Sequence, residues 1–217
     1  MDGRNLAAGK DFKVTYKNNV KTGTAELVLT GTGNYTGTVE TTFTIKPASL
    51  KNADISGIVH KVYNGKPHTQ TPVVKLKDKT LKLDRDYYLA YKNNVNTGRA
   101  TIAIKGKGNY TGVAVRYFAV KPKASWIDSL TSPGKKKITV RWGRRTQISG
   151  YQIEFSTRED FGSPRTQKNV YDPEKLSMTV SLAKSKTLYY VRIRTFKKTK
   201  DKTYFSTWSK TKTIVTK

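Results

Sequence analysis

The chain has 217 residues and a formal net charge of +27, from 42 lysines and arginines against 15 aspartates and glutamates. It has no cysteine, which excludes disulfides and thiolate-bound metal sites, and its mean hydropathy is −0.64. The 13 tyrosines, 7 phenylalanines and 3 tryptophans still supply enough apolar bulk for two or three small domains.

The first half of the chain repeats itself at a shift of 75 residues. The matching segments are Tyr16–Val20 with Tyr91–Val95, Gly31–Gly37 with Gly106–Gly112, and Lys46-Pro47 with Lys121-Pro122. Self-similarity at a fixed period indicates one structural unit used twice. We therefore expect three domains: a truncated copy of the repeat over 1–47, a complete copy over 48–122, and a different domain over 123–217.

Within each copy, apolar and polar residues alternate with a period of two. The alternating residues are Phe12, Val14 and Tyr16, then Leu27 and Leu29, and in the second copy Tyr87, Leu89 and Tyr91, then Ile102 and Ile104. This period predicts half-buried strands, and no stretch has the 3.6-residue period of a helix. Turns are predicted at Asn18-Asn19 and Asn93-Asn94 and in the Gly-rich segments, whose Tyr35 and Tyr110 we expect to fill their sandwiches.

The first copy lacks the opening part of its unit, because residues 48–75 have no counterpart before Met1. That segment contains three apolar pairs, Ile58-Val59, Val62-Tyr63 and Val73-Val74, which we interpret as opening strands. Residues 1–47 are therefore predicted to expose a sheet edge. Such an edge favours pairing with the next repeat, with an upstream segment, or with another chain, which would be self-association.

From about Lys123 the repeat ends and a new pattern of short strands begins. Its core candidates are Trp126, Ile138-Val140-Trp142, Tyr151-Ile153-Phe155, Met178-Val180-Leu182 and Tyr189-Val191-Ile193. Pro and Gly turn signals separate them, and about seven short strands at this spacing predict a β-sandwich.

Two family resemblances follow from these segments. Residues 123–217 resemble a bacterial fibronectin type III domain, in the segments Ile138–Trp142, Ser149–Ser156, Leu188–Arg194 and Phe205–Ser209. The resemblance implies that Phe205–Ser209 is the last strand of this domain. Residues 1–122 resemble tandem Ig-like repeats of large surface or secreted proteins of Gram-positive gut bacteria, in Tyr63–Pro67, Asp86-Tyr87, Tyr91–Asn94 and Gly106–Gly112. Together they imply an all-β fold of tandem β-sandwiches, Ig-like repeats followed by a fibronectin type III-like sandwich, as used in stalks, spacers and adhesive modules.

Few residues suggest catalysis or metal binding. The two histidines, His60 and His68, have no third ligand, and neither lies in a nucleophile motif. The acidic pairs at 84–86 and 159–160 lack the spacing of a calcium loop, and strands follow the Gly-rich segments where a phosphate loop needs a helix. We expect no catalytic residue, no metal and no cofactor, and we interpret the chain as non-enzymatic.

The basic residues form the one candidate binding site. If Tyr189, Val191 and Ile193 point inward, then Tyr190, Arg192 and Arg194 point outward together. The hairpin that follows adds Lys197, Lys198, Lys200 and Lys202, and Trp208 completes the set. Phe205–Ser209 also resembles the Trp-Ser box of cytokine-receptor fibronectin modules, which implies that Trp208 stacks on Arg192 or Arg194 as a structural ladder. Glu154 is expected to pair with one of these arginines, and ligand binding and the structural ladder are compatible.

The expected partner is a host protein or glycan, or an anionic wall polymer. We do not expect nucleic acid as a partner, because no nucleic-acid-binding motif is present and the basic residues are scattered. No apolar run is long enough to span a membrane, and no signal peptide opens the chain, so we expect any export signal outside it. The leading hypothesis is an adhesive or spacer segment of a bacterial cell-surface or secreted protein. Two alternatives are a host-protein receptor module such as an immunoglobulin-binding protein, and an accessory region of a large surface enzyme.

Overall fold

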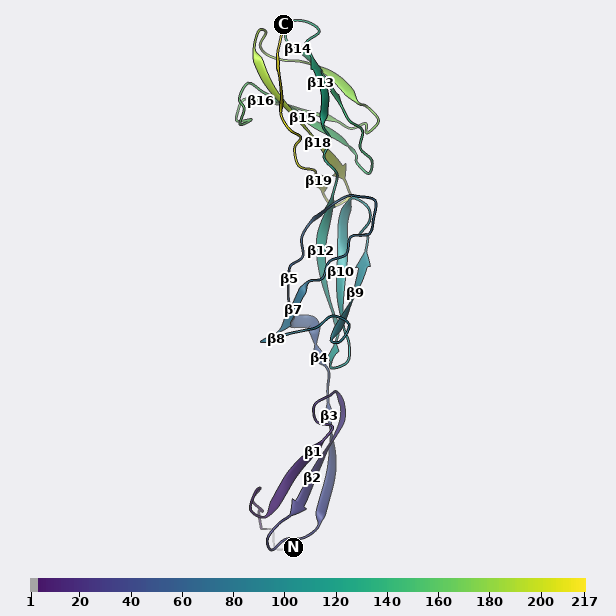
Figure 1. Ribbon diagram of the computed structural model, residues 1–217, viewed down its shortest axis with the longest axis vertical. Helices are drawn as coiled ribbons and strands as arrows, with labels where there is room; N and C mark the ends of the chain where they lie inside the picture. Colours follow the sequence, from purple (N-terminus) through teal and green to yellow (C-terminus); the bar gives the residue numbers. More distant parts are fainter. Residues whose placement is uncertain (1–3) are drawn as a thin grey trace. The chain divides into compact units, whose positions relative to one another are not determined.

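The computed structural model describes residues 4–217, which form β-strands and, within that range, one 3-10 turn, η1 (Leu50–Asn52) (Figure 1). The predicted all-β fold class is confirmed. None of the described residues forms a helix with the length and apolarity that crossing a membrane requires. By contacts the chain divides into two compact units: the first holds the described residues up to Gly57, Pro72–Ala90 and Ala103–Val115, and the second holds Ile58–Thr71, Tyr91–Ile102 and Arg116–Lys217. The three predicted domain boundaries stay predictions.

The first repeat is a three-stranded antiparallel sheet, coloured purple to blue in Figure 1. Its strands are β1 (Phe12–Lys17), β2 (Gly23–Gly31) and β3 (Thr38–Ile45), in the order β1-β2-β3. Asn18, at the first connection, has φ of 56°, a left-handed conformation that asparagine tolerates better than most residues. Both predicted strands of this copy are confirmed.

The second repeat contains the corresponding strands and additional ones. Its strands are β4 (Ala48–Ser49), β5 (Asp54–Ser56), β6 (Lys61–Val62), β7 (Val73–Leu76), β8 (Lys79–Thr80), β9 (Tyr87–Lys92), β10 (Gly98–Gly106), β11 (Tyr110–Thr111) and β12 (Val113–Lys121). They form a four-stranded sheet in the order β6-β12-β10-β9, a three-stranded sheet β5-β7-β8, and a short pair β11-β4. Tyr110 is buried as predicted, whereas Tyr35, its counterpart in the first copy, is only half-buried.

Residues 123–217 form two sheets that share one core. One sheet has the order β13 (Ile127–Thr131), β14 (Lys137–Trp142), β17 (Ser177–Ser181). The other has the order β16 (Arg165–Val170), β15 (Gly150–Ser156), β18 (Leu188–Lys198), β19 (Thr203–Phe205), with β20 (Lys212–Val215) also paired to β18. The core draws buried side chains from both sheets, among them Val140, Trp142, Ile153, Val191 and Ile193. This arrangement of a three-stranded sheet against a five-stranded sheet is a fibronectin type III-like sandwich.

Three predictions about particular segments are wrong. Trp126 was predicted in the core, but it is 46% exposed, because it precedes β13 and stacks on Arg145, whose guanidinium carbon lies 4.2 Å from its ring. Ile58-Val59 forms no strand; the backbone N–H of Val59 donates instead to the side chain of Gln70. The predicted last strand over Phe205–Ser209 is interrupted after Phe205 and resumes only at Lys212.

Candidate binding face

The outward face of the sheet containing β18 carries the predicted row of side chains. Tyr189, Val191 and Ile193 are no more than 5% exposed and lie in the core. Because neighbouring residues of a strand point to opposite sides, half-buried Tyr190, Arg192 and Arg194 lie on the outward face. The predicted orientation of this strand is confirmed. We call this surface the outward face.

Two arginines and three aromatic rings stack alternately across the outward face. The guanidinium carbon of Arg192 lies 3.9 Å from the ring centroid of Phe161 and 4.4 Å from that of Trp208. The guanidinium carbon of Arg194 lies 4.3 Å from Trp208 and 4.0 Å from Phe205. The order is therefore Phe161, Arg192, Trp208, Arg194, Phe205, which we call the ladder. The predicted stacking of Trp208 is confirmed, and it involves both arginines.

Polar side chains on β15 accept hydrogen bonds from the two arginines of the ladder. Glu154 is 3% exposed, and its Oε2 accepts hydrogen bonds from Arg192 Nε at 2.8 Å and from Arg192 Nη2 at 2.6 Å. The Nε of Arg165 lies 3.4 Å from the other oxygen of the same carboxylate. Gln152 Oε1 accepts from Arg194 Nε at 2.7 Å. Burial lowers the pKa of Arg194, as does the charge of Arg192, while Glu154 acts in the opposite direction. The buried carboxylate thus offsets part of the charge gathered on this face.

Serine hydroxyls explain why the last strand is interrupted at the ladder. The backbone N–H of Thr195 donates to Ser206 Oγ at 3.0 Å, and that of Ile193 donates to Ser209 Oγ at 3.1 Å. These side chains take the places that backbone carbonyls would occupy in a continuous strand pair. The backbone between these two serines forms no strand, and Trp208, which lies between them, stacks on the arginines.

The four lysines of the β18–β19 hairpin do not lie together as one cluster. By alternation along β18, Lys198 continues the outward row beyond Phe196, whereas Lys197 lies on the opposite side. Lys200 lies in the turn between β18 and β19, and the Lys202 ammonium lies 4.9 Å from the Tyr204 ring centroid. The structure therefore joins Arg192, Arg194 and Trp208, and it places Tyr190 and Lys198 on the same face. The binding role of all eight residues stays a prediction.

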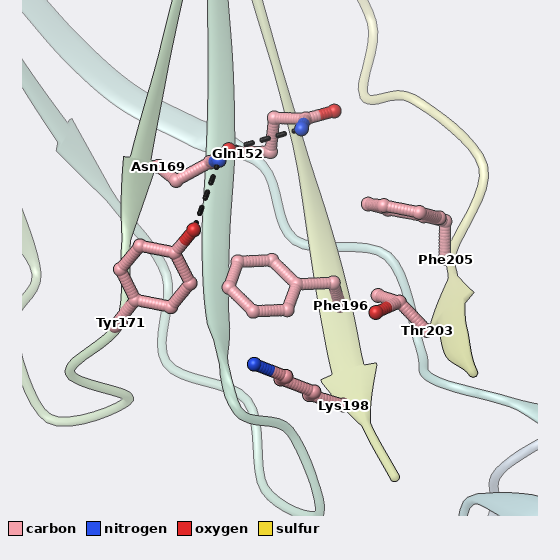
Figure 2. A pocket seen from close by; sticks show the side chains of 7 residues that line it. All are labelled: Gln152, Asn169, Tyr171, Phe196, Lys198, Thr203 and Phe205. Carbon is pink, nitrogen blue, oxygen red and sulfur yellow. Dashed lines mark hydrogen bonds between the residues drawn. The ribbon is translucent and has the colours of Figure 1, made fainter. Parts of the chain in front are cut away.

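A cleft of about 170 Å³ lies beside the ladder. It is lined by Gln152, Asn169, Tyr171, Phe196, Lys198, Thr203 and Phe205 (Figure 2). Figure 2 shows Phe196 between Tyr171 and Phe205, and the ring centroids are 5.6 Å and 6.2 Å from that of Phe196, respectively. Tyr171 is 69% exposed, so its ring is open to a ligand.

Hydrogen bonds connect this cleft to the ladder. The amide nitrogen of Gln152, whose oxygen holds Arg194, donates to Asn169 Oδ1 at 2.9 Å (Figure 2). The amide nitrogen of Asn169 donates in turn to the Tyr171 hydroxyl at 3.4 Å. One continuous chain of contacts therefore orients the polar end of the cleft.

Sequence reasoning missed most of this cleft. Phe196 and Lys198 could have been found by continuing the alternation of β18 two residues further. Tyr171 and Asn169 gave no such signal, because they come from β16 and the turn after it, and only pairing with β15 brings them beside Gln152.

The remaining polar candidates form no joint site among the described residues. His60 Nδ1 accepts the backbone N–H of Ala119 at 3.1 Å, whereas His68 is half-buried and its buried Nε2 has no hydrogen-bond partner within residues 4–217. Asp86 and Asp160 each pair with a neighbouring arginine at 2.6 Å, Arg85 and Arg158 respectively. Over residues 4–217, no three histidine, aspartate or glutamate side chains are placed to hold a metal ion. What the outward face offers chemically is aromatic surface, amide and hydroxyl groups, and positive charge.

No protein-family profile and no curated protein matches this chain. Among solved structures it is similar to the FN1–FN3 domains of chicken CNTN1, with 16% identity over 89% of this chain and 77% of that one, and a TM-score of 0.40. It is also similar to the sixth fibronectin type III domain of human fibronectin type III domain containing protein 3, with 16% identity over 45% and 87%, and a TM-score of 0.33. A computationally redesigned β-sandwich protein gives 20% identity over 43% and 89%, and a TM-score of 0.35. These scores are too low to support a statement about function.

Proposed function

We propose that this chain is a non-enzymatic binding segment of a modular protein that is secreted by a bacterium or displayed on its surface. Its ligand is an acidic polysaccharide, held by the outward face of residues 123–217. The repeats over 1–122 act as spacers that carry this face. The bacterial setting rests on the sequence resemblance alone, and the ligand class rests on the chemistry of the cleft.

The cleft beside the ladder is the observation that carries the proposal. Tyr171 offers an exposed ring on which the apolar face of a sugar can rest, and small-ligand sites are commonly aromatic surfaces with a few placed polar groups. Asn169 and Thr203 add amide and hydroxyl groups to the lining of the cleft, suited to sugar hydroxyls. Lys198 supplies an ammonium group for a carboxylate or sulfate on the sugar.

The charge of the surrounding domain favours the same class of ligand. Residues 123–217 contain 22 basic and 7 acidic side chains, which is more than half of the net charge of the chain. A surface of one sign attracts a polymer of the opposite sign and raises its association rate. Charge thus draws an acidic polymer to the domain, and the cleft determines where it rests.

Titration with polygalacturonate, a carboxylated polysaccharide, tests this proposal, with neutral dextran as the control polymer. Calorimetry at about 50 mM and about 500 mM salt separates the screened ionic contribution from the stacking contribution. We expect Tyr171→Ala to weaken binding about tenfold at both salt concentrations, which corresponds to the loss of one aromatic contact. Lys198→Ala should weaken binding mainly at low salt.

Lys135→Ala is the matched control, because Lys135 is also exposed but lies in the turn between β13 and β14. It should leave the affinity within about twofold of the original chain. Equal losses for Lys135→Ala and Lys198→Ala, with no effect of Tyr171→Ala, would show that binding is a diffuse charge effect and that the cleft has no part in it.

A further inference from the structure

Strand β16 carries polar residues from one end of the outward face to the other. Asn169 lies opposite Gln152 in the pairing with β15, and both residues line the cleft beside the ladder. Arg165 lies opposite Ser156 at the other end of the same pairing. Because Arg165 and Asn169 are four residues apart on one strand, they lie on the same side of the sheet, about 13 Å apart at about 3.3 Å per residue. The outward face therefore extends beyond the cleft along the length of β16.

A second cleft, of about 130 Å³, lies at the Arg165 end of this strand. Two cations, Arg165 and Lys184, and two hydroxyl-bearing residues, Thr157 and Thr166, contribute to its lining. Within residues 4–217, those that line it include no aspartate and no glutamate. Charged donors form the strongest hydrogen bonds with carboxylates and sulfates, and hydroxyl groups can donate further ones. The second cleft thus offers the donors that an acidic group on a sugar requires.

The charges around Arg165 leave it able to bind an external anion. The Glu154 carboxylate accepts two hydrogen bonds from Arg192 through Oε2, and its Oε1 lies 3.4 Å from Arg165 Nε. Arg194 pairs instead with the uncharged amide of Gln152. One carboxylate therefore serves two of these three guanidinium groups. The side chain of Arg165 is 48% exposed, against 25% for that of Arg192, so an anion in solution reaches Arg165 more readily.

Buried side chains fix the backbone that carries Lys184, in the connection between β17 and β18. Its backbone N–H donates to the Tyr189 hydroxyl at 3.3 Å, and its carbonyl accepts a hydrogen bond from Thr216 Oγ1 at 3.0 Å. Tyr189 is 5% exposed and Thr216 is 2% exposed. The connection is therefore held through backbone atoms of Lys184, and its ammonium group can be removed by substitution without the loss of these bonds.

We propose that the second cleft is a further anion-binding subsite, in which Arg165 and Lys184 bind an acidic group of the polysaccharide that occupies the cleft beside the ladder. The polymer then lies along β16 and carries an acidic group to each end of the outward face. This inference rests on the proposed function and adds a requirement for length. One chain that occupies both clefts gains affinity through effective concentration, and a fragment that fills only one cleft does not.

Oligogalacturonates of two and of ten sugars, titrated into the intact chain by calorimetry at low salt, test this proposal. The ten-sugar oligomer should bind about tenfold tighter than the two-sugar fragment, because only the longer one reaches both clefts. Lys184→Ala should remove most of this difference and leave the affinity for the two-sugar fragment within about twofold of the original.

Lys186→Ala is the matched control, because Lys186 is exposed in the same connection and is not among the residues that line the second cleft. It should leave both affinities within about twofold of the original chain. Arg165→Gln is a second variant and should weaken only the longer oligomer. Its unfolding in urea, followed by Trp142 fluorescence, verifies that the domain is still folded.

The outcomes separate this inference from the proposed function. Equal effects of Lys184→Ala and Lys186→Ala, or equal affinities of the two oligomers, would overturn the second subsite. If Tyr171→Ala still weakens both oligomers in that case, the proposed function stands without the second subsite. Absence of binding by either oligomer would overturn both.

Discussion

At the scale of single residues, the outward face depends on Trp208, which lies between two guanidinium groups. Trp126 is a natural comparison, because it contacts one arginine and is 46% exposed. The third tryptophan, Trp142, is 1% exposed in the core of the same domain, and its fluorescence therefore reports unfolding of that domain.

We predict that Trp208→Ala lowers the free energy of unfolding of residues 123–217 by about 3 kcal/mol, since two cation–π contacts and the packing of a half-buried ring are lost. Trp126→Ala should cost about 1 kcal/mol, for one contact at an exposed site. Urea unfolding followed by Trp142 fluorescence measures both. Equal costs would show that the ladder stabilises the domain no more than an ordinary surface contact does.

Asp86 gives the second repeat a dependence on pH. Its carboxylate accepts hydrogen bonds from Arg85 Nε at 2.9 Å and from the backbone N–H of Lys82 at 2.8 Å, and it is 7% exposed. The hydrogen bonds from Arg85 are the largest cause that lowers its pKa below the ordinary value of 3.8, and the bond from Lys82 adds to them. A lowered pKa in the folded state means that the ionised form stabilises the fold.

We predict that Asp86→Asn lowers the stability of the second repeat by about 2 kcal/mol at pH values well above 3.8, where the carboxylate is ionised in both states. The difference should shrink as the pH falls below 3.8 towards the lower pKa of the folded state. Hydrogen exchange in β10 across this pH range measures the effect, and Asp54→Asn, at an exposed carboxylate, is the control. A difference that grows on acidification would contradict the assignment.

At the scale of elements, the start of β15 determines how closely β16 and β18 approach it. Gly150 has φ of 153°, and a Cβ placed there would lie 1.9 Å from the Val170 carbonyl oxygen and 2.9 Å from Phe196 Cζ. Val170 is on β16 and Phe196 is on β18 and lines the cleft, so this glycine lets both neighbouring strands close on β15.

We predict that Gly150→Ala costs about 3 kcal/mol or more, because the strands must separate and the backbone is strained. Gly134→Ala is the matched control, since a Cβ there meets no atom within 4 Å, and it should change stability by less than about 0.5 kcal/mol. Urea unfolding followed by Trp142 fluorescence compares the two. Similar costs would mean that the close approach at Gly150 is not required.

The strands also show which parts of the fold could be predicted from the sequence alone. The period of two placed β1, β9, β14, β15 and β18 correctly, because successive side chains of a strand point to opposite faces and the apolar ones therefore share one face. It failed where side chains replace backbone partners, as at Ser206 and Ser209, whose hydroxyls interrupt the last strand. It also failed at Trp126, whose apolar ring is satisfied by a guanidinium on the surface and not by the core.

The candidate site likewise contains residues that the sequence could predict and residues that it could not. Arg192, Arg194 and Trp208 were predictable, because two lie on one strand at the right spacing and the third belongs to a segment with a known resemblance. Phe161 and Tyr171 were not, because each lies in a loop or turn and reaches the site only through the pairing of β15 with β16. Local patterns record which face of a strand is buried, but they do not record which loop will lie beside it.

At the scale of the whole molecule, charge and shape have separate roles. The net charge of +27 attracts any polyanion and is spread over many exposed lysines, so it selects a class of ligand and not a position. The few aromatic and amide groups of the cleft determine where on the domain the ligand binds. They lie beside the ladder, whose arginines donate hydrogen bonds to Glu154 and Gln152. We therefore predict that binding is both salt-dependent and localised.

The contact site of polygalacturonate can be mapped most directly by proton–nitrogen correlation spectra of the intact chain. We expect the backbone signals that shift first to belong to Asn169, Tyr171, Lys198, Thr203 and Phe205. Lys135 and Lys137, which are also exposed but lie in the turn before β14 and at its start, should shift little. Shifts spread evenly over all exposed lysines, with none at Tyr171, would contradict the claim that the outward face is the binding site.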